Sequence, residues 1–196
     1  MKRANILFVA LFTIFAFVSA ANAQQNNFAV GTMLQDFSLP DINGKTSSFN
    51  SLKGKNGTVL IFLSTQCPVV KGYDERINQI AADYQAKGIN FVGINSNFTE
   101  SPTIVKLHAE KNYKFPVLID KGNVYADKLG ATVTPEVYFF DEKNVLVYQG
   151  AIDNDRSGKN VSENVLRDAF EAKLGGKTIA KTRANAFGCT IKRVEK

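Results

Sequence analysis

The 196-residue sequence contains no tryptophan, a single histidine and only two cysteines, Cys67 and Cys189. These counts are too low for a structural zinc site, which usually takes four cysteine or histidine ligands. The net charge is +6, but the basic residues are scattered and form no dense run, so we expect no nucleic-acid partner. We also expect no metal ion and no other cofactor.

Long apolar stretches are equally scarce, because only residues 6–18 form one. This run is short for a membrane-spanning helix, which needs about 20 residues. It follows two positive residues and precedes small residues in an A-x-A pattern at Ala21 and Ala23. We therefore interpret residues 1–23 as a signal peptide that exports the protein to the periplasm or beyond, with no stable membrane insertion after cleavage. An uncleaved N-terminal anchor or a buried helix is the alternative.

The remaining chain is predicted to form a single domain. Residues 24–30 are interpreted as a mobile lead-in, residues 31–177 as the domain, and residues 178–196 as a tail that carries Cys189. Export implies an oxidising compartment, in which an even pair of cysteines favours a disulfide.

Apolar periodicity predicts the order of elements within the domain. The order is a hairpin over 36–57, a strand at 58–64, a helix at 68–87, a strand at 89–95, a helix at 101–112, a strand at 115–120, a short helix at 123–130, a hairpin of strands 136–141 and 145–150, and a helix at 162–175. Long helices between buried strands imply parallel pairing, whereas the closing hairpin adds antiparallel strands. We predict an α/β three-layer sandwich, with a mixed central sheet, helices on both faces and an N-terminal hairpin.

The segment STQCPVVKGY places Cys67 between a buried strand and the helix that Pro68 begins. The free N–H groups and positive dipole end of a helix stabilise a thiolate, and Lys71, one turn further on, adds a positive charge. Val70 occupies the second cysteine position of a C-x-x-C motif, so no local disulfide can form. Cys67 is a candidate redox nucleophile, and a buried, inert thiol is the alternative.

A second candidate feature is Thr134-Pro135, which stands immediately before the strand at 136–141. A cis proline opposite a helix-start cysteine turns backbone groups toward the sulfur and offers an extended substrate a strand to pair with. From these two residues alone, an ordinary trans proline at the start of a strand is the commoner case.

Three motifs occur in order along the chain: C-P-x-V-K-x-Y at 67–73, T-P-E at 134–136 and G-C-[ST]-I-K at 188–192. Together they resemble a bacterial set in the redoxin branch of the thioredoxin-like superfamily, the alkyl hydroperoxide reductase/thiol-specific antioxidant-like (AhpC/TSA-like) proteins. The resemblance covers about residues 31–175 and implies a thioredoxin fold and a cis Pro135. It also implies catalytic roles for Cys67, Lys71 and Pro135, and substrate contacts from Thr134, Pro68 and Ser64.

The sequence departs from better-known redoxin patterns at several positions. Peroxiredoxins have a proline where this chain has Leu60, and an arginine near the region of Thr134-Pro135; Arg76 or Arg156 could replace that arginine only if the fold brings one close. Lys71 replaces the second cysteine of Sco-type copper proteins. We expect His108, the only histidine, to be a solvated or packing residue. The acidic turn Asp153–Asp155 is expected to be a solvated turn rather than a calcium site or a cleft wall.

Cys189 lies 189 − 67 = 122 residues after Cys67, so only the fold can bring the two sulfurs together. Three roles are open to it. It could resolve an intermediate formed on Cys67, hold the tail through a permanent disulfide, or pair with another molecule.

The favoured hypothesis is an exported thiol–disulfide oxidoreductase that uses Cys67 on protein or small-molecule disulfides and takes electrons from an unknown thiol donor. The second is a thiol peroxidase, in which a hydroperoxide oxidises Cys67 to sulfenic acid. The third is a non-catalytic binding module, which the lack of a C-x-x-C motif favours.

Overall fold

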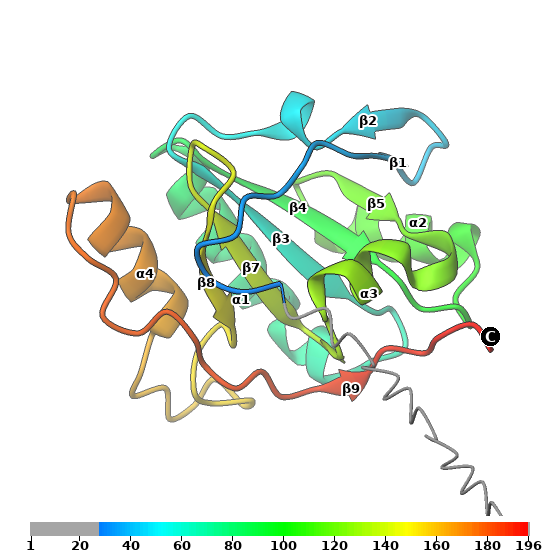
Figure 1. Ribbon diagram of the computed structural model, residues 1–196. Coiled ribbons are helices and arrows are strands. Elements are labelled where there is room, and N and C mark those ends of the chain that lie inside the picture. Colours follow the sequence, from blue (N-terminus) through cyan, green and yellow to red (C-terminus); the bar gives the residue numbers. More distant parts are fainter. Residues whose placement is uncertain (1–27, 196) are drawn as a thin grey trace, which may run out of the picture.

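The computed structural model describes residues 28–195 (Figure 1), so the predicted signal peptide lies outside the described residues. The end of the predicted lead-in is included, and Phe28 and Val30 pack against the core. None of the helices within residues 28–195 has the length and apolar character needed to cross a bilayer.

The described chain alternates strands and helices in nearly the predicted order. The strands are β1 (Ser38–Pro40), β2 (Thr46–Ser48), β3 (Gly57–Leu63), β4 (Ile89–Asn95), β5 (Val117–Ile119), β6 (Val133–Thr134), β7 (Glu136–Phe140), β8 (Leu146–Gly150) and β9 (Cys189–Thr190). The helices are α1 (Pro68–Gln85), α2 (Pro102–Asn112), α3 (Val124–Leu129) and α4 (Val165–Leu174), with two 3₁₀ turns, η1 (Asn50–Leu52) and η2 (Lys121–Asn123).

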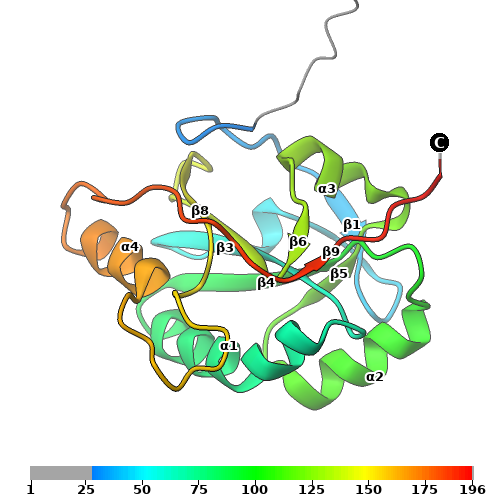
Figure 2. The same cartoon turned by 90° about the horizontal axis from the view of Figure 1, so that it is seen from below.

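The central sheet has five strands in the order β5-β4-β3-β7-β8. Strands β3, β4 and β5 are parallel, whereas β7 pairs antiparallel with both β3 and β8. Helices α1, α2 and α4 cover one face, and α3 and the N-terminal hairpin of β1 and β2 cover the other (Figure 2). The predicted mixed α/β sandwich is confirmed.

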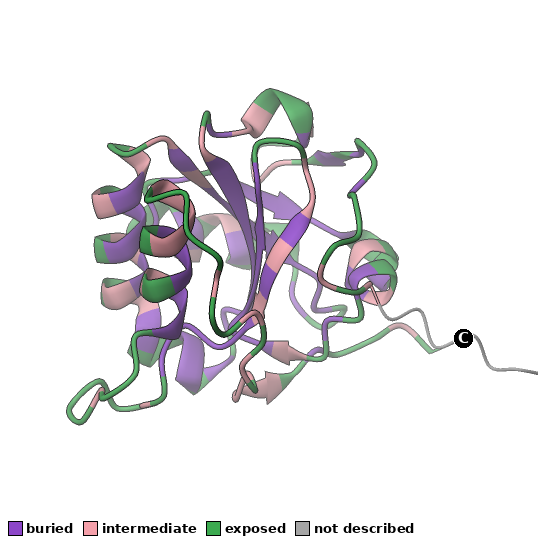
Figure 3. Cartoon of the chain, turned by 60° about the vertical axis from the view of Figure 1, so that its left-hand side comes forward, coloured by how far each residue is buried: buried purple, intermediate pink, exposed green. Residues whose placement is uncertain are grey.

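Burial on both faces explains why β3 reads as a continuous apolar run. Every residue of β3 is buried, and the strand lies at the centre of the sheet (Figure 3). Val59, Ile61 and Leu63 pack under α1 and α4, while Leu60 and Phe62 pack against the opposite cluster. Successive side chains of β3 thus enter opposite clusters. The strand ends at Leu63, and α1 begins at Pro68, immediately after Cys67.

Helix α4 begins three residues later than predicted, at Val165. The Asn154 side-chain oxygen accepts hydrogen bonds from the backbone N–H groups of Ser162 and Glu163, each at 3.0 Å. These bonds hold the preceding segment against the loop at 153–155, so the chain joins the helix only after Asn164. Helical periodicity in the sequence does not register such a side-chain contact.

The tail beyond α4 is held along the edge of the domain over most of its length. It passes β8, where Ala184 N donates to Gln149 O at 3.1 Å, and then reaches β6 (Figure 2). Ile191 is buried in the second core cluster. The tail therefore belongs to the fold, and its path places Cys189 beside the start of α1.

Candidate active site

Cys67 ends the short loop between β3 and α1 and immediately precedes the helix. Its extended backbone, with φ −80° and ψ 115°, makes it the N-cap of the helix, and Pro68 occupies the first turn. Proline is favoured there because its missing N–H would have no helical partner. The Cys67 side chain is 1% exposed. Its sulfur therefore lies at the positive end of an 18-residue helix, in a site largely closed to water.

The second cysteine is carried by β9, which pairs antiparallel with β6. Cys189 is opposite Thr134 in this pairing, and Thr190 is opposite Val133. One residue further on, Ile191 N donates to Thr132 O at 3.0 Å. The tail thus forms a second strand on the segment that leads into Pro135.

Cys67 and Cys189 form a disulfide, with 5.7 Å between their Cα atoms. The bond spans 122 residues and leaves no free cysteine in the described part of the chain. Of the three roles considered for Cys189, pairing with another molecule is not the arrangement found. The other two, resolution of an intermediate and a permanent link, both use this bond.

The Thr134–Pro135 peptide is cis. The Thr134 carbonyl oxygen lies 3.2 Å from the Cys67 sulfur, and its hydroxyl donates to Cys189 O at 3.4 Å. A disulfide sulfur carries no hydrogen, so the first contact can become an S–H···O bond only when Cys67 is reduced and protonated. Thr134 thus contacts both cysteines.

Gly188 approaches the same carbonyl more closely than any other residue type could. A Cβ built on it would lie 1.9 Å from Thr134 O and 2.6 Å from its carbonyl carbon. Both are backbone atoms next to the paired strands, so neither can move without disturbing β6. Glycine at position 188 is therefore a steric condition for β9 to reach its place.

Ser64 and the residues after it are held by a buried carboxylate that the sequence analysis did not single out. The Ser64 hydroxyl donates to Glu100 Oε1, while Thr65 N and Asn95 Nδ2 donate to Glu100 Oε2, both at 2.8 Å. Glu100 is 8% exposed and forms no ion pair among the described residues. The Ser64 hydroxyl, predicted to contact substrate, is buried and engaged with Glu100, so it orders the loop that precedes Cys67.

Pro68 and Lys71 lie on the exposed side of the first turn of α1. The Lys71 side chain has no hydrogen-bond or ion-pair partner in the described residues, and it lies one helical turn beyond Cys67. The structure thus brings Cys67, Cys189, Lys71, Thr134, Pro68 and Pro135 to one end of the sheet and places Ser64 beneath them.

Comparison with known proteins identifies the family. The AhpC/TSA family profile matches residues 30–149, more than half of the chain. The chain belongs to the AhpC/TSA family. Its fold is thioredoxin-like, because it also aligns with a putative thiol:disulfide interchange protein DsbE from Chlorobium tepidum, at 22% identity, over 75% of this chain and 99% of that chain, with a TM-score of 0.62.

This AhpC/TSA protein has relatives with higher identity among solved structures. A hypothetical protein from Sinorhizobium meliloti 1021 is 34% identical, over 86% of this chain and 96% of that chain, with a TM-score of 0.79. An uncharacterized conserved protein from Geobacillus kaustophilus is 33% identical, over 87% and 95%, with a TM-score of 0.81. The thiol-disulfide oxidoreductase ResA of Halalkalibacterium halodurans is 26% identical, over 75% of this chain and 82% of that protein.

The tyrosine of the segment C-P-x-V-K-x-Y packs near the tail of this AhpC/TSA protein. Tyr73 is buried, and its hydroxyl donates to Asp153 Oδ1 at 2.6 Å. Burial and the Asp153 carboxylate raise the pKa of Tyr73 well above its usual range. The Phe187 ring lies 6.2 Å from the Tyr73 ring, two residues before Cys189. The segment therefore carries Cys67 and contacts the tail two residues before Cys189.

Asp153 is not the solvated turn residue that the sequence suggested, since it is 4% exposed. Arg76 Nη1 donates to Asp153 Oδ2 at 2.7 Å, and the same guanidinium donates to the backbone oxygens of Asp155 and Arg156 at 2.9 Å each. The Arg76 guanidinium is thus bound by this loop and paired with the Asp153 carboxylate. Nothing in the loop sequence reveals the arginine that neutralises Asp153, because it lies 77 residues earlier.

The remaining residues considered for metal chemistry play structural parts. His108 Nε2 lies 3.3 Å from Asp74 Oδ2, which links α2 to α1, and the His108 side chain is 16% exposed. Within residues 28–195 no three His, Cys, Asp or Glu side chains gather in a group that could hold a metal ion.

Proposed function

We propose that this redoxin is an exported thiol–disulfide oxidoreductase with Cys67 and Cys189 as its redox pair. The observation that carries the proposal is the disulfide, which joins the start of α1 to the strand paired with Thr134. It places a sulfur whose thiolate the helix stabilises within bonding distance of a second cysteine. The relatives named thiol-disulfide oxidoreductase support this reaction class.

In the reduced protein, the Cys67 thiolate attacks one sulfur of a substrate disulfide and forms a mixed disulfide, while the other substrate sulfur leaves as a thiolate. Cys189 then loses its proton and attacks the Cys67 sulfur. This step closes the Cys67–Cys189 bond and releases the second substrate thiolate. The substrate gains two electrons, the protein loses two, and a thiol donor restores the reduced form.

The surrounding residues have distinct parts in this scheme. The start of α1 and Lys71 lower the pKa of the Cys67 thiol by favouring its anion. Thr134 and Pro135 offer an extended substrate a backbone edge in the reduced protein, an edge that β9 occupies in the oxidised structure, and Pro68 lies exposed at the start of α1. Protein or small-molecule disulfides are the proposed substrates.

Export to the periplasm or the exterior is the second part of the proposal. It rests on residues 1–23, whose charged start, short apolar run and A-x-A pattern fit a signal peptide. A stable disulfide fits an oxidising compartment better than the cytosol. N-terminal sequencing of the protein recovered from the periplasm tests this, and a chain that still begins at Met1 contradicts cleavage.

Peroxide reduction is less well supported than disulfide exchange. Arg76, one candidate for polarising a peroxide, is bound by Asp153. Arg156 is exposed, 5.8 Å from the Phe187 ring, and Leu60 is buried within β3. A non-catalytic binding role accounts less well for a cysteine pair placed at a helix start.

One paired assay separates the three hypotheses. The mature chain is tested for reduction of a protein disulfide by a thiol donor and for consumption of hydrogen peroxide, with Cys67→Ser as the control. Disulfide reduction that disappears in the variant supports the proposal. Faster loss of peroxide than of disulfide indicates a peroxidase, and neither activity indicates a binding module.

A further inference from the structure

We infer that the electron donor enters this redox centre through Cys189, so that Cys67 is the sulfur expelled when the disulfide opens. The inference rests on the proposed oxidoreductase function and assigns the two sulfurs different partners. The substrate disulfide bonds to Cys67, and the donor thiol bonds to Cys189.

Access is the first reason. Cys67 is 1% exposed, enclosed by β3, α1 and the tail, whereas Cys189 is partly exposed. Cys189 lies on β9, a strand that pairs on one side with β6 and has no second strand within the described residues. A thiolate that arrives from solvent therefore meets the Cys189 sulfur before it can meet the Cys67 sulfur.

Leaving-group chemistry is the second reason. In thiol–disulfide exchange the incoming sulfur approaches opposite the bond that breaks, and a thiol of lower pKa leaves faster. Attack on Cys189 expels Cys67, whose thiolate lies at the N-terminus of an 18-residue helix. Attack on Cys67 would instead expel Cys189, whose sulfur lies beside the start of α1 but whose backbone belongs to β9, so that Cys67 alone is the N-cap residue of the helix. Access and leaving-group stability therefore favour the same sulfur.

The docking of the tail on both sides of Cys189 is the third reason. Before it, Ala184 N donates to Gln149 O at 3.1 Å, and after it, Phe98 N donates to Lys192 O at 2.9 Å and Ile191 N to Thr132 O at 3.0 Å. None of these bonds involves sulfur, so none of them has to break for a donor thiol to attack Cys189. The donor step therefore needs no unfolding of the tail, whereas the substrate step requires the Cys67 sulfur to be uncovered.

The electron balance is that of a dithiol donor. One donor thiolate attacks the Cys189 sulfur, a donor–Cys189 bond forms, and the Cys67–Cys189 bond breaks with its electron pair remaining on Cys67. The second donor thiolate then attacks the donor sulfur of the mixed disulfide and expels the Cys189 thiolate, which takes a proton from water. The donor leaves as a disulfide, having lost two electrons, and both cysteines are reduced.

The test maps which cysteine carries the first adduct. Oxidised protein is mixed with reduced glutathione, quenched in acid at early times, alkylated and digested, and the two cysteine peptides are quantified by mass spectrometry. We expect glutathione on Cys189 at least about tenfold more often than on Cys67. The same reaction in guanidinium chloride is the matched control, where the preference disappears because the fold creates it. A thioredoxin whose resolving cysteine is replaced by serine repeats the test with a protein donor.

The outcomes separate this inference from the function on which it rests. If glutathione and the protein donor are both found mainly on Cys67, the inferred entry through Cys189 is wrong. The proposed oxidoreductase function is not affected by that outcome. A disulfide that neither thiol opens until the protein unfolds overturns both, because such a bond is structural. The inference is also wrong if the ratio of adducts on Cys189 to adducts on Cys67 is the same in folded and unfolded protein.

Discussion

Gly188 packs so tightly against Thr134 that a methyl group at position 188 would lie 1.9 Å from the Thr134 carbonyl oxygen. The residue before Cys189 thus decides whether the tail can reach β6. We predict that Gly188→Ala displaces β9, lowers the free energy of unfolding by about 1–3 kcal/mol, and slows formation of the disulfide on reoxidation. Denaturant unfolding and timed alkylation of free thiols measure the two effects.

Gly72 provides the matched control, because a Cβ built on it meets no atom within 4 Å. It is exposed in α1, so Gly72→Ala is expected to add about 1 kcal/mol of stability through helix propensity and to leave disulfide formation unchanged. Equal behaviour of the two variants contradicts the steric role of Gly188.

Loss of the disulfide is expected to destabilise the domain. The bond closes a loop of 122 residues, and removing a disulfide of this kind costs about 2–5 kcal/mol, because the unfolded chain gains conformational freedom. Unfolding of the wild type with and without reductant, beside Cys189→Ser, measures the effect. The variant should match the reduced wild type, and a variant as stable as the oxidised protein contradicts this prediction.

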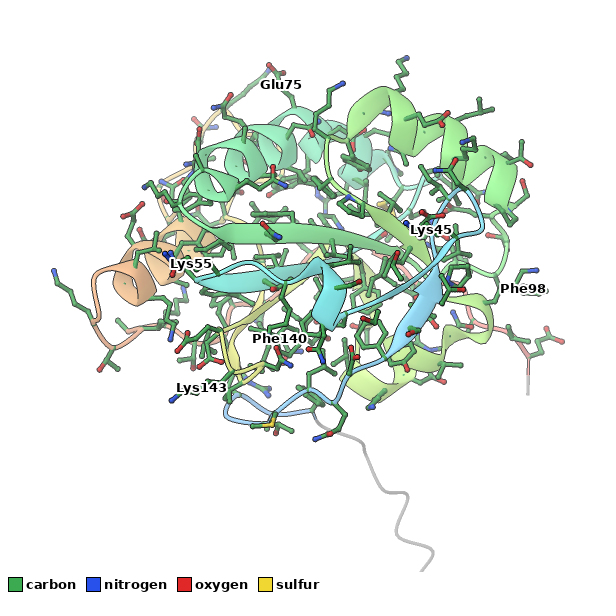
Figure 4. All side chains as sticks on the ribbon, turned by 90° about the horizontal axis from the view of Figure 1, so that it is seen from above. Lys45, Lys55, Glu75, Phe98, Phe140 and Lys143 are labelled. Atoms are coloured by element: carbon green, nitrogen blue, oxygen red, sulfur yellow. A yellow bond between two sulfur atoms is a disulfide. The ribbon has the colours of Figure 1, made fainter. Side chains whose placement is uncertain are left out.

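Glu100 is expected to be a positioning residue for Cys67. Its carboxylate accepts hydrogen bonds from Ser64, Thr65 and Asn95, so Glu100→Ala leaves buried donors without partners and should cost about 2–4 kcal/mol. In the reduced variant, the rate at which Cys67 is alkylated should also depend on pH differently than in the reduced wild type, because the loop before the helix start is loosened. Glu75→Gln is the control, since Glu75 extends into solvent from α1 (Figure 4). An unchanged pH profile contradicts the positioning role.

Lys71 is expected to stabilise the Cys67 thiolate from one helical turn away. In a Cys189→Ser background, Lys71→Met should raise the pKa of the Cys67 thiol by about 0.2–0.4 unit, which corresponds to the roughly 0.2–0.5 kcal/mol of an i,i+4 pair on a helix. Ultraviolet absorbance of the thiolate against pH measures the change. Lys55→Met is the control, because Lys55 is an exposed lysine on the loop before β3 (Figure 4). Equal shifts in both variants mean that net charge, rather than the position of Lys71, is responsible.

The tyrosines predict how the protein responds to alkali. All six have a raised pKa, chiefly because burial disfavours their ionised form, and that of Tyr84 rises from 10.0 to about 12. A raised folded-state pKa contributes stability that is complete below pH 10 and is lost as the pH rises toward 12. Tyrosinate absorbance and circular dichroism should therefore change together. Ionisation of most tyrosines before the secondary structure is lost contradicts this.

Much of the fold follows from patterns that the sequence carries locally. The stripe of Tyr73, Ile77, Ile80 and Tyr84 predicts α1, and all four residues are buried. The turn at Asn43-Gly44 predicts the N-terminal hairpin, in which Gly44 has φ +79°. These features were predictable because each depends on residues close together in the chain.

The contacts that complete the site could not be found in the same way. Glu100 reaches Ser64 across 36 positions, and Arg76 reaches Asp153 across 77. The sequence does not distinguish a buried carboxylate from an exposed one, because the hydrogen-bond donors that bind it belong to other elements of the fold. The motif around Cys189 marked the tail as part of the site, but its pairing with β6 depends on the path of the whole chain.

The disulfide also fixes when the redox centre can exist during the life of the chain. Cys189 leaves the ribosome 122 residues after Cys67, and synthesis at about 5–20 residues per second makes that delay roughly 6–24 s. Throughout this interval Cys67 has no partner of its own. In the folded chain the two sulfurs are brought together by β6, β8 and the tail, all of which are made after Cys67. A closed disulfide therefore requires that the chain has been made as far as Cys189, and a chain truncated before Gly188 keeps a solitary thiol.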